Sequence, residues 1–221
     1  MENAKYPRTP YLPYSPGLSS KSQVIETLDR LTTNPVIMTE KMDGSNVCLT
    51  RHHVYARSHS GPPTHPSFDF IKAWHASVRY QIPEGISLFG EYCYAIHSIQ
   101  YFTLPFPFFL FGVRDDKKEE WVSWPAVETI ASRLGVPTVP LLFRGALLDA
   151  AGLEKLVLEF AGQPSIHGAE REGIVVRRKF EFPCSEFELS VAKYVRPNHV
   201  QTDEHWSHQQ IRKQRIGESD A

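Results

Sequence analysis

Two lysines and two glutamates stand where the alternation of a strand would put a charge on an apolar face: Lys41, Glu91, Glu172 and Lys193. The apolar residues that share these faces are Ile37 for Lys41, Phe89 for Glu91, Ile174 and Val176 for Glu172, and Phe187, Leu189 and Val191 for Lys193. Such a charge is costly unless it meets a partner, and burial lowers the pKa of a lysine, which exposes the free amine needed for nucleophilic attack. The four side chains could line one pocket. The alternative is that the strands end there and the charges reach solvent.

A tight turn follows the first of these lysines. The run Lys41-Met42-Asp43-Gly44-Ser45-Asn46 lies between two predicted strands, and its glycine would let the backbone approach a ligand closely. A lysine, an acidic residue and a glycine at this spacing occur by chance in many chains, so an ordinary β-turn is the alternative. The turn indicates a nucleophile only if residues of matching chemistry accompany it.

Further short segments follow along the chain. They are Ala56-Arg57-Ser58, Phe89-Gly90-Glu91-Tyr92, Phe109-Leu110-Phe111-Gly112-Val113, Glu172-Gly173-Ile174-Val175-Val176 and Val191-Ala192-Lys193-Tyr194. With the turn at Lys41, this ordered set resembles the covalent nucleotidyltransferase superfamily of polynucleotide ligases and mRNA-capping enzymes. The form of the turn, the short chain and the Glu-Gly-Ile-Val-Val segment look most like RNA ligases of the T4 RNA ligase 2 type.

The resemblance implies that Lys41 attacks the α-phosphate of ATP, expels pyrophosphate and carries AMP as a phosphoramidate. Lys193 would contact that phosphate. Its charge, with that of a metal ion, would lower the pKa of Lys41 and keep the amine neutral. Glu172 would bind or position the metal, which we expect to be Mg²⁺ or Mn²⁺ because hard cations prefer oxygen ligands. Lys41 and Lys193 are therefore the expected catalytic residues.

The same resemblance implies nucleotide-binding roles for five other residues. Glu91 would accept hydrogen bonds from the ribose hydroxyls, Arg57 would hold the sugar or a nearby phosphate, and Phe111 would stack on adenine. Asn46 would lie near the metal through a water molecule. Glu40 would help to read the adenine edge through its backbone.

In the later steps that the resemblance implies, AMP moves to the 5′-phosphate of an RNA strand and a 3′-hydroxyl displaces it to join the ends. The alternatives are a DNA ligase or capping guanylyltransferase, and a non-catalytic RNA- or nucleotide-binding module. Two departures favour the module mildly: Gly112 stands where the family commonly has an acidic residue, and Val195 where it often has a second lysine. Little sequence follows Lys193, which favours a minimal RNA ligase without an OB-fold and raises the alternative that sealing needs an accessory repair protein.

Composition indicates the setting of this chemistry. The net charge is -1 and the pI ≈ 6.8, so RNA would have to meet a local basic surface. The cysteines, Cys48, Cys93 and Cys184, form no close pair, which argues against disulfides and a zinc site and favours a reducing compartment. The sequence shows no bilayer-spanning run or signal peptide, so we expect a cytoplasmic protein with no membrane contact. His59 and His65 follow Arg57 and could border a nucleotide.

Short strands and a few helices must position these residues. The predicted strands cover residues 36–41, 46–51, 54–57, 86–92, 106–113, 173–178 and 187–194, and the predicted helices cover 21–31, 70–78, 127–134 and 147–160. This mixture predicts an α+β fold of mainly antiparallel sheets flanked by helices. The resemblance implies the nucleotidyltransferase (ATP-grasp-like) domain of polynucleotide ligases. We expect one domain over residues 1–221, with an extended Pro/Tyr arm at 1–20 and a polar C-terminal tail at 201–221 that could begin as a helix.

Overall fold

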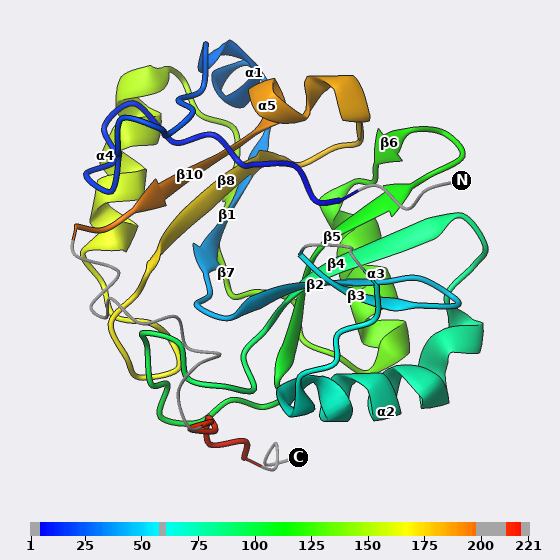
Figure 1. The fold of residues 1–221 in the computed structure, drawn as a ribbon. Helices are drawn as coiled ribbons and strands as arrows, with labels where there is room; N and C mark the ends of the chain where they lie inside the picture. The colour runs from blue at the N-terminus through cyan, green and yellow to red at the C-terminus, as the bar shows by residue number, and fades with distance from the viewer. Residues whose placement is uncertain (1–4, 58–60, 198–210, 218–221) are drawn as a thin grey trace.

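Two antiparallel sheets with helices packed against them form the fold (Figure 1). The structure is a computed structural model, and it describes residues 5–57, 61–197 and 211–217. The predicted α+β class of antiparallel sheets flanked by helices is confirmed. Within these residues, no helix has the length and apolar character needed to cross a bilayer.

Sheet A has the strand order β10-β8-β1-β7. Its strands are β1 (Val36–Lys41), β7 (Leu141–Gly145), β8 (Gly173–Arg178) and β10 (Val191–Val195). Helices α1 (Asp29–Thr32) and α4 (Ala150–Ala161) pack on one face, where Ile174 and Val176 are fully buried. Because side chains alternate along a strand, the residues between them face the other way, toward the second sheet.

Sheet B has the strand order β3-β2-β4-β5-β6-β9. Its strands are β2 (Ser45–Leu49), β3 (Val54–Ala56), β4 (Ile86–Tyr92), β5 (Phe108–Asp115), β6 (Glu120–Trp121) and β9 (Phe182–Pro183). Helices α2 (Asp69–Val78) and α3 (Trp124–Leu134) share its large apolar core. Single 3₁₀ turns, η1 (Pro66–Phe68), η2 (Arg79–Gln81) and η3 (Cys184–Glu186), connect these elements.

Local sequence explains where the longer helices begin and end. Helix α3 has Pro125 in its first turn, and Gly135 ends it with φ 68, a left-handed conformation that glycine adopts without strain. Helix α4 begins at Asp149, whose carboxylate accepts a hydrogen bond of 2.8 Å from the Gly152 amide. These signals fix the helices that support each sheet from outside.

The inner faces of the two sheets meet in an apolar cluster. Cys48 and Phe89 come from sheet B, Val175 and Val191 from sheet A, and Phe187 from helix α5 (Phe187–Ser190). The chain passes from sheet A to sheet B at the turn between β1 and β2. The residues of that turn are therefore held by both sheets.

Most predicted elements are confirmed, and two are wrong. Strands β1, β4 and β8 have the predicted bounds. The predicted helix 21–31 is helical only at Asp29–Thr32, because Val24 instead bridges Tyr11 and the Ile25 amide donates to the Tyr11 carbonyl. The predicted strand 187–194 is helical over its first half, so Phe187 and Leu189 do not share a strand face with Lys193. Strands β6, β7 and β9 were not predicted.

The chain's N-terminal arm, here residues 5–17, runs beside β10 without forming a helix (Figure 1). Tyr11 bridges Lys193, and Leu12 is fully buried. Of the tail predicted at 201–221, residues 211–217 are described and make isolated bridges, Lys213 with Ala95 and Ile216 with Leu104. Residues 201–210, where a helix could begin, lie outside the described residues.

Candidate active site

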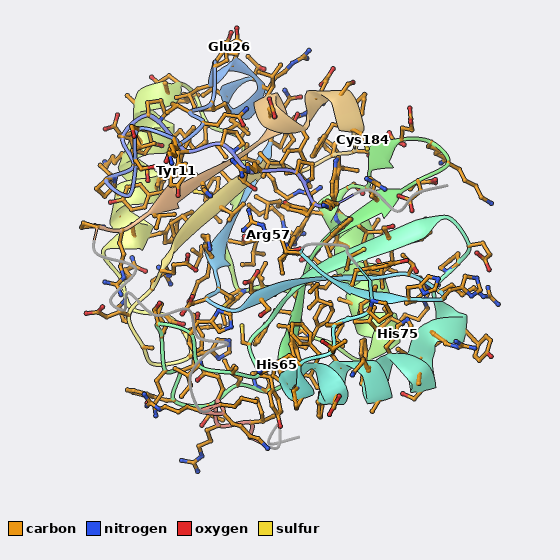
Figure 2. The ribbon with its side chains drawn as sticks, in the orientation of Figure 1. Tyr11, Glu26, Arg57, His65, His75 and Cys184 are labelled. Atoms are coloured by element: carbon orange, nitrogen blue, oxygen red, sulfur yellow. The ribbon has the colours of Figure 1, made fainter. Side chains whose placement is uncertain are left out.

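A cavity of about 910 Å³ lies between the inner faces of the two sheets. Every residue predicted for the site lines it: Glu40, Lys41, Asn46, Arg57, Glu91, Phe111, Glu172 and Lys193. Arg57 lies between the two sheets in Figure 2. His65 also lines the cavity, whereas His59 lies outside the described residues. The sequence therefore identified a set of residues that converge in space.

Lys41 and Glu172 form an ion pair in the lining of the cavity. Lys41 ends β1 opposite Gly173, the first residue of β8, so that Glu172 lies just beyond the paired region. The Lys41 Nζ and Glu172 Oε1 atoms are 2.5 Å apart, and the Glu172 side chain is 4% exposed. Glu172 was predicted to share a strand face with Ile174 and Val176, but it lines the cavity with Val175 instead. The prediction is wrong because Glu172 precedes strand β8 and so does not follow its alternation.

The pKa of Lys41 is raised in the metal-free chain, whereas the predicted lowering concerned the amine beside Lys193 and a bound metal ion. Burial by itself lowers it, but Glu172, Glu91 and Asp43 together raise it above the usual lysine range. The amine of the nucleotide-free chain is therefore protonated at neutral pH. A neutral nucleophile requires that positive charge approach these carboxylates.

Lys193 shows the opposite shift. It pairs with Val175 in the sheet, as Thr39 of β1 also does, so alternation turns Lys193 to the same face as Lys41. Burial and then the charge of Lys41 lower the pKa of Lys193 to about 8, although Glu172 opposes the shift. Its Nζ lies 4.1 Å from the centre of the Tyr11 ring, a cation–π contact.

Glu91 lies on β4 directly opposite Asn46 of β2. Burial raises the pKa of Glu91 to about 8; Lys41 opposes this shift, while Glu172 and Asp43 add to it. Its Oε1 accepts a hydrogen bond of 3.1 Å from the Gly44 amide. A neutral Glu91 can donate a hydrogen bond as well as accept one.

The turn after Lys41 is fixed by buried hydrogen bonds. Asp43 Oδ2 accepts from the amides of Ser98 and Ile99, both at 2.7 Å, and the Asp43 amide donates to the Tyr101 hydroxyl at 2.8 Å. A Cβ atom at Gly44 would lie 2.7 Å from the Tyr92 carbonyl oxygen, so no larger residue fits without movement. The turn holds the end of β1 in one geometry.

Glu40 lies behind Lys41 and is fully buried. Its side chain pairs with Arg171, with 3.4 Å between Glu40 Oε2 and Arg171 Nε. Its amide donates to the Pro140 carbonyl at 2.9 Å. The residue therefore anchors the strand next to the nucleophile position while bordering the cavity.

Aromatic residues also line the cavity. A register shift between β4 and β5 leaves Phe111 without a strand partner, since Phe89 pairs with Gly112 and Gly90 with Leu110. Phe111 borders the cavity with Trp121, Phe182 and Phe187. These aromatic side chains can contact a flat apolar ring, and the two lysines can contact anionic oxygens.

Sequence reasoning missed several cavity residues because their partners are distant in the chain. Tyr6 packs its ring among those of Phe89, Phe111, Trp121 and Phe187, with centroid distances of 5.0 to 5.3 Å. Arg177 is buried and donates to the Val122 carbonyl at 2.8 Å, and burial lowers its pKa to about 10. Strand parity with Val175 could have identified Arg177. No local signal marks Tyr6 or the Asp43–Tyr101 contact.

The metal-binding capacity of the cavity is limited. Among the residues that the structure describes, no group of three or more His, Cys, Asp and Glu side chains could hold an ion. Glu172 could supply an oxygen ligand, and a hard divalent cation would need phosphate oxygens and water to complete its shell. The site fits a metal that arrives with a phosphorylated ligand.

Comparison with known proteins gives one family. The family described as RNA ligase matches residues 34–195, a stretch that includes all the predicted site residues. No curated protein matches the chain. The family description names no subtype, so the T4 RNA ligase 2 type stays a prediction.

Several solved structures of an RNA ligase from Naegleria gruberi share the fold. An apo mutant has a TM-score of 0.54 and 20% identity, and the match covers 80% of this chain and 53% of that one. A mutant with AMP and Mn has a TM-score of 0.55 and 18% identity, and the match covers 80% of this chain and 54% of that one. Another mutant, with ATP and Mn, has a TM-score of 0.55 and 19% identity, and the match covers 91% of this chain and 61% of that one. The chain thus spans little more than half the length of these structures.

Proposed function

This chain belongs to the RNA ligase family, and from that premise we propose that it is an ATP-dependent RNA ligase that forms a lysyl-AMP intermediate. The observation that carries the proposal is the cavity itself. It brings two lysines, two carboxylates and several aromatic rings into one lining around about 910 Å³. A cavity of this volume, lined by both charged and aromatic side chains, suits a nucleoside triphosphate.

Lys41 is the proposed nucleophile. Its amine, once neutral, attacks the α-phosphorus of ATP, forms an N–P bond and expels pyrophosphate. Lys193 holds the phosphate oxygens, and charge on it also disfavours a proton on Lys41. Loss of the Lys41 proton requires relief from Glu172, Glu91 and Asp43, whose charges raise its pKa.

Glu172 is the proposed protein ligand of Mg²⁺ or Mn²⁺. A divalent cation bound there supplies positive charge that offsets the carboxylate and stabilises charge on phosphate. The Naegleria ligase structures that contain ATP or AMP also contain Mn. Asn46, which faces Glu91 across β2 and β4, would act through water.

The remaining residues hold the nucleoside. Phe111 stacks on adenine, Glu91 hydrogen-bonds the ribose hydroxyls, and Arg57 holds the sugar or a phosphate. Glu40 reads the adenine edge through its backbone, which is consistent with a side chain committed to Arg171. These assignments account for every predicted residue in the cavity lining.

RNA with a 5′-phosphate and a 3′-hydroxyl is the proposed partner. AMP passes from Lys41 to the 5′-phosphate, and the 3′-hydroxyl then displaces AMP to join the ends. An accessory repair protein is a further proposed partner in sealing. Three free cysteines agree with a reducing compartment such as the cytoplasm.

The test is the intact mass of the purified chain after incubation with Mg²⁺ and either ATP or GTP. We expect a gain of one AMP with ATP. Lys41→Ala should abolish it, whereas Lys155→Ala, at an exposed lysine of α4, should not. A GMP adduct would indicate a capping-type enzyme, and no adduct with either nucleotide would indicate a binding module.

Strand joining needs a separate assay. Pre-adenylated RNA incubated with an acceptor strand should give a longer product without ATP. An AMP adduct without any such product would refute ligation while leaving the nucleotidyltransferase activity intact.

A further inference from the structure

The N-terminal arm borders the cavity beside its aromatic residues. Tyr6, Pro7 and Thr9 are part of the cavity lining. The next residues extend sheet A beyond β10: the Leu12 amide donates to the Lys193 carbonyl at 2.7 Å, and the Lys193 amide donates to the Pro10 carbonyl at 2.9 Å. The arm is thus hydrogen-bonded to the strand that carries Lys193.

Tyr6 is enclosed by aromatic rings from sheet B and from helix α5. Its ring centroid is 5.0 Å from that of Phe111 at an interplanar angle of 74°, an edge-on contact. Trp121 and Phe187 also meet it edge-on, at 5.2 Å each. Edge-to-face pairs are a favoured arrangement of aromatic rings, so this cage holds the Tyr6 ring in a defined position.

Gly112 fits this cage. A Cβ atom there would lie 3.4 Å from Trp121 and 3.8 Å from Tyr6. A carboxylate at this position would extend among these rings and would lose its hydration there. The absence of an acidic residue is therefore explained by the aromatic cluster around Tyr6.

Val195 fits the arm in the same way. A Cβ atom at Gly17 of the arm would lie 3.1 Å from the Val195 Cβ atom. The Val195 amide donates to Ser15 Oγ at 2.9 Å, and its carbonyl accepts from the Gly17 amide at 3.2 Å. Both departures from the family pattern, at 112 and 195, thus lie where the arm packs.

We propose that Tyr6 forms the end wall of the base compartment in the nucleotide site, and so limits the size of the base that the cavity admits. The inference rests on the proposed use of this cavity for ATP. The cavity keeps its volume of about 910 Å³ with the Tyr6 ring in place, which fits a wall better than a plug. Tyr6 touches Phe111, the residue on which adenine is proposed to stack.

Calorimetric titration of the full chain with ATP and with ATP analogues enlarged at N6, C2 or C8 tests this inference. The parent chain should bind ATP and reject analogues whose added group points to the Tyr6 ring. In Tyr6→Ala, the affinity for at least one rejected analogue should rise about tenfold relative to ATP, because the wall is removed. Tyr6→Phe, which keeps the ring, should retain the parent's preference.

Control variants distinguish loss of the Tyr6 wall from a general loss of stability. Tyr80→Ala removes an exposed tyrosine outside the cavity and should leave the preference unchanged. Tyr6→Leu, which keeps apolar contacts in the cage, serves if the alanine variant melts below the assay temperature. Equal discrimination by the parent chain and by folded Tyr6→Ala or Tyr6→Leu would refute the wall.

The titration and the mass assay distinguish two failures. ATP binding without an AMP adduct would refute the proposed catalysis, while the analogue preference still tests Tyr6. An adduct in the parent chain with unchanged preference in folded Tyr6→Ala and Tyr6→Leu would refute only the wall. No binding of ATP would refute both.

Discussion

Lys41 and Lys193 face the same cavity, yet their neighbours shift their pKa values in opposite directions. Three carboxylates outweigh burial at Lys41, whereas burial and the charge of Lys41 dominate at Lys193. The free chain thus has one lysine that is fully charged and one that titrates just above neutral pH. In the proposed reaction, Lys41 has to lose its proton before it attacks, and Lys193 has to keep its proton to hold a phosphate.

The pH dependence of ATP binding follows from Lys193. Its lowered pKa of about 8 means that the amine is charged below pH 8 and loses its charge above it. We expect ATP affinity, measured by calorimetry, to fall by roughly tenfold per pH unit above that value.

Lys193→Arg provides the control, because a guanidinium stays charged throughout. Glu91 also has a pKa of about 8 and gains negative charge in the same range. If the arginine variant loses affinity above pH 8 as the parent does, Glu91 or another group is responsible and the role of Lys193 is wrong.

At the scale of single residues, sequence reasoning identified the groups and not their charge states. Order along the chain was enough to select Lys41, Glu172 and Lys193, because the chemistry fixes these residue types. Their pKa values depend on Glu91 and Asp43, brought close by folding. Tyr6 was missed because its four ring partners lie more than eighty residues away in the chain.

At the scale of elements, the Asp43 carboxylate holds the β1–β2 turn against residues 98 and 99. Asp43→Ala would leave the buried amides of Ser98 and Ile99 without their acceptor. We expect a loss on the order of 3 kcal/mol in the free energy of unfolding, measured in urea, together with slower AMP adduct formation.

Asp149→Ala is the matched control, since this aspartate also accepts from a backbone amide, but at the exposed start of α4. It should cost about 1 kcal/mol and leave adduct formation unchanged. Equal costs for the two variants would contradict the importance of burial at Asp43.

Strong local signals predicted elements well. The apolar alternation of β1, β4 and β8 gave their bounds, and Gly135 marked the end of α3. The segment 21–31 failed because its apolar spacing fits a helix, while pairing with the arm at Tyr11 overrides that tendency. The two-residue strands β6 and β9 are too short for a period to be visible.

At the scale of the whole molecule, Arg177 ties the two sheets together. It lies on β8 of sheet A and donates to the carbonyl of Val122, which follows β6 of sheet B. Arg177→Met should lower the free energy of unfolding on the order of 3 kcal/mol, because it leaves buried carbonyls without donors.

Arg144→Met, at a partly exposed ion pair with Glu128, should change the free energy of unfolding by less than about 1 kcal/mol. Urea titrations followed by tryptophan fluorescence and by circular dichroism would compare the variants. A loss at Arg177 no larger than that at Arg144 would show that the two sheets are held by apolar contacts alone.

The passage of the chain from sheet A to sheet B at Lys41 has a mechanical consequence. The Lys41 amine lies where the chain passes from one sheet to the other, and the Gly44 amide of the adjoining turn donates to Glu91 of sheet B. If a ligand between the sheets changed their spacing, it would also move the Lys41 amine relative to that ligand. The spacing of the two sheets and the position of the Lys41 amine in the cavity would therefore change together.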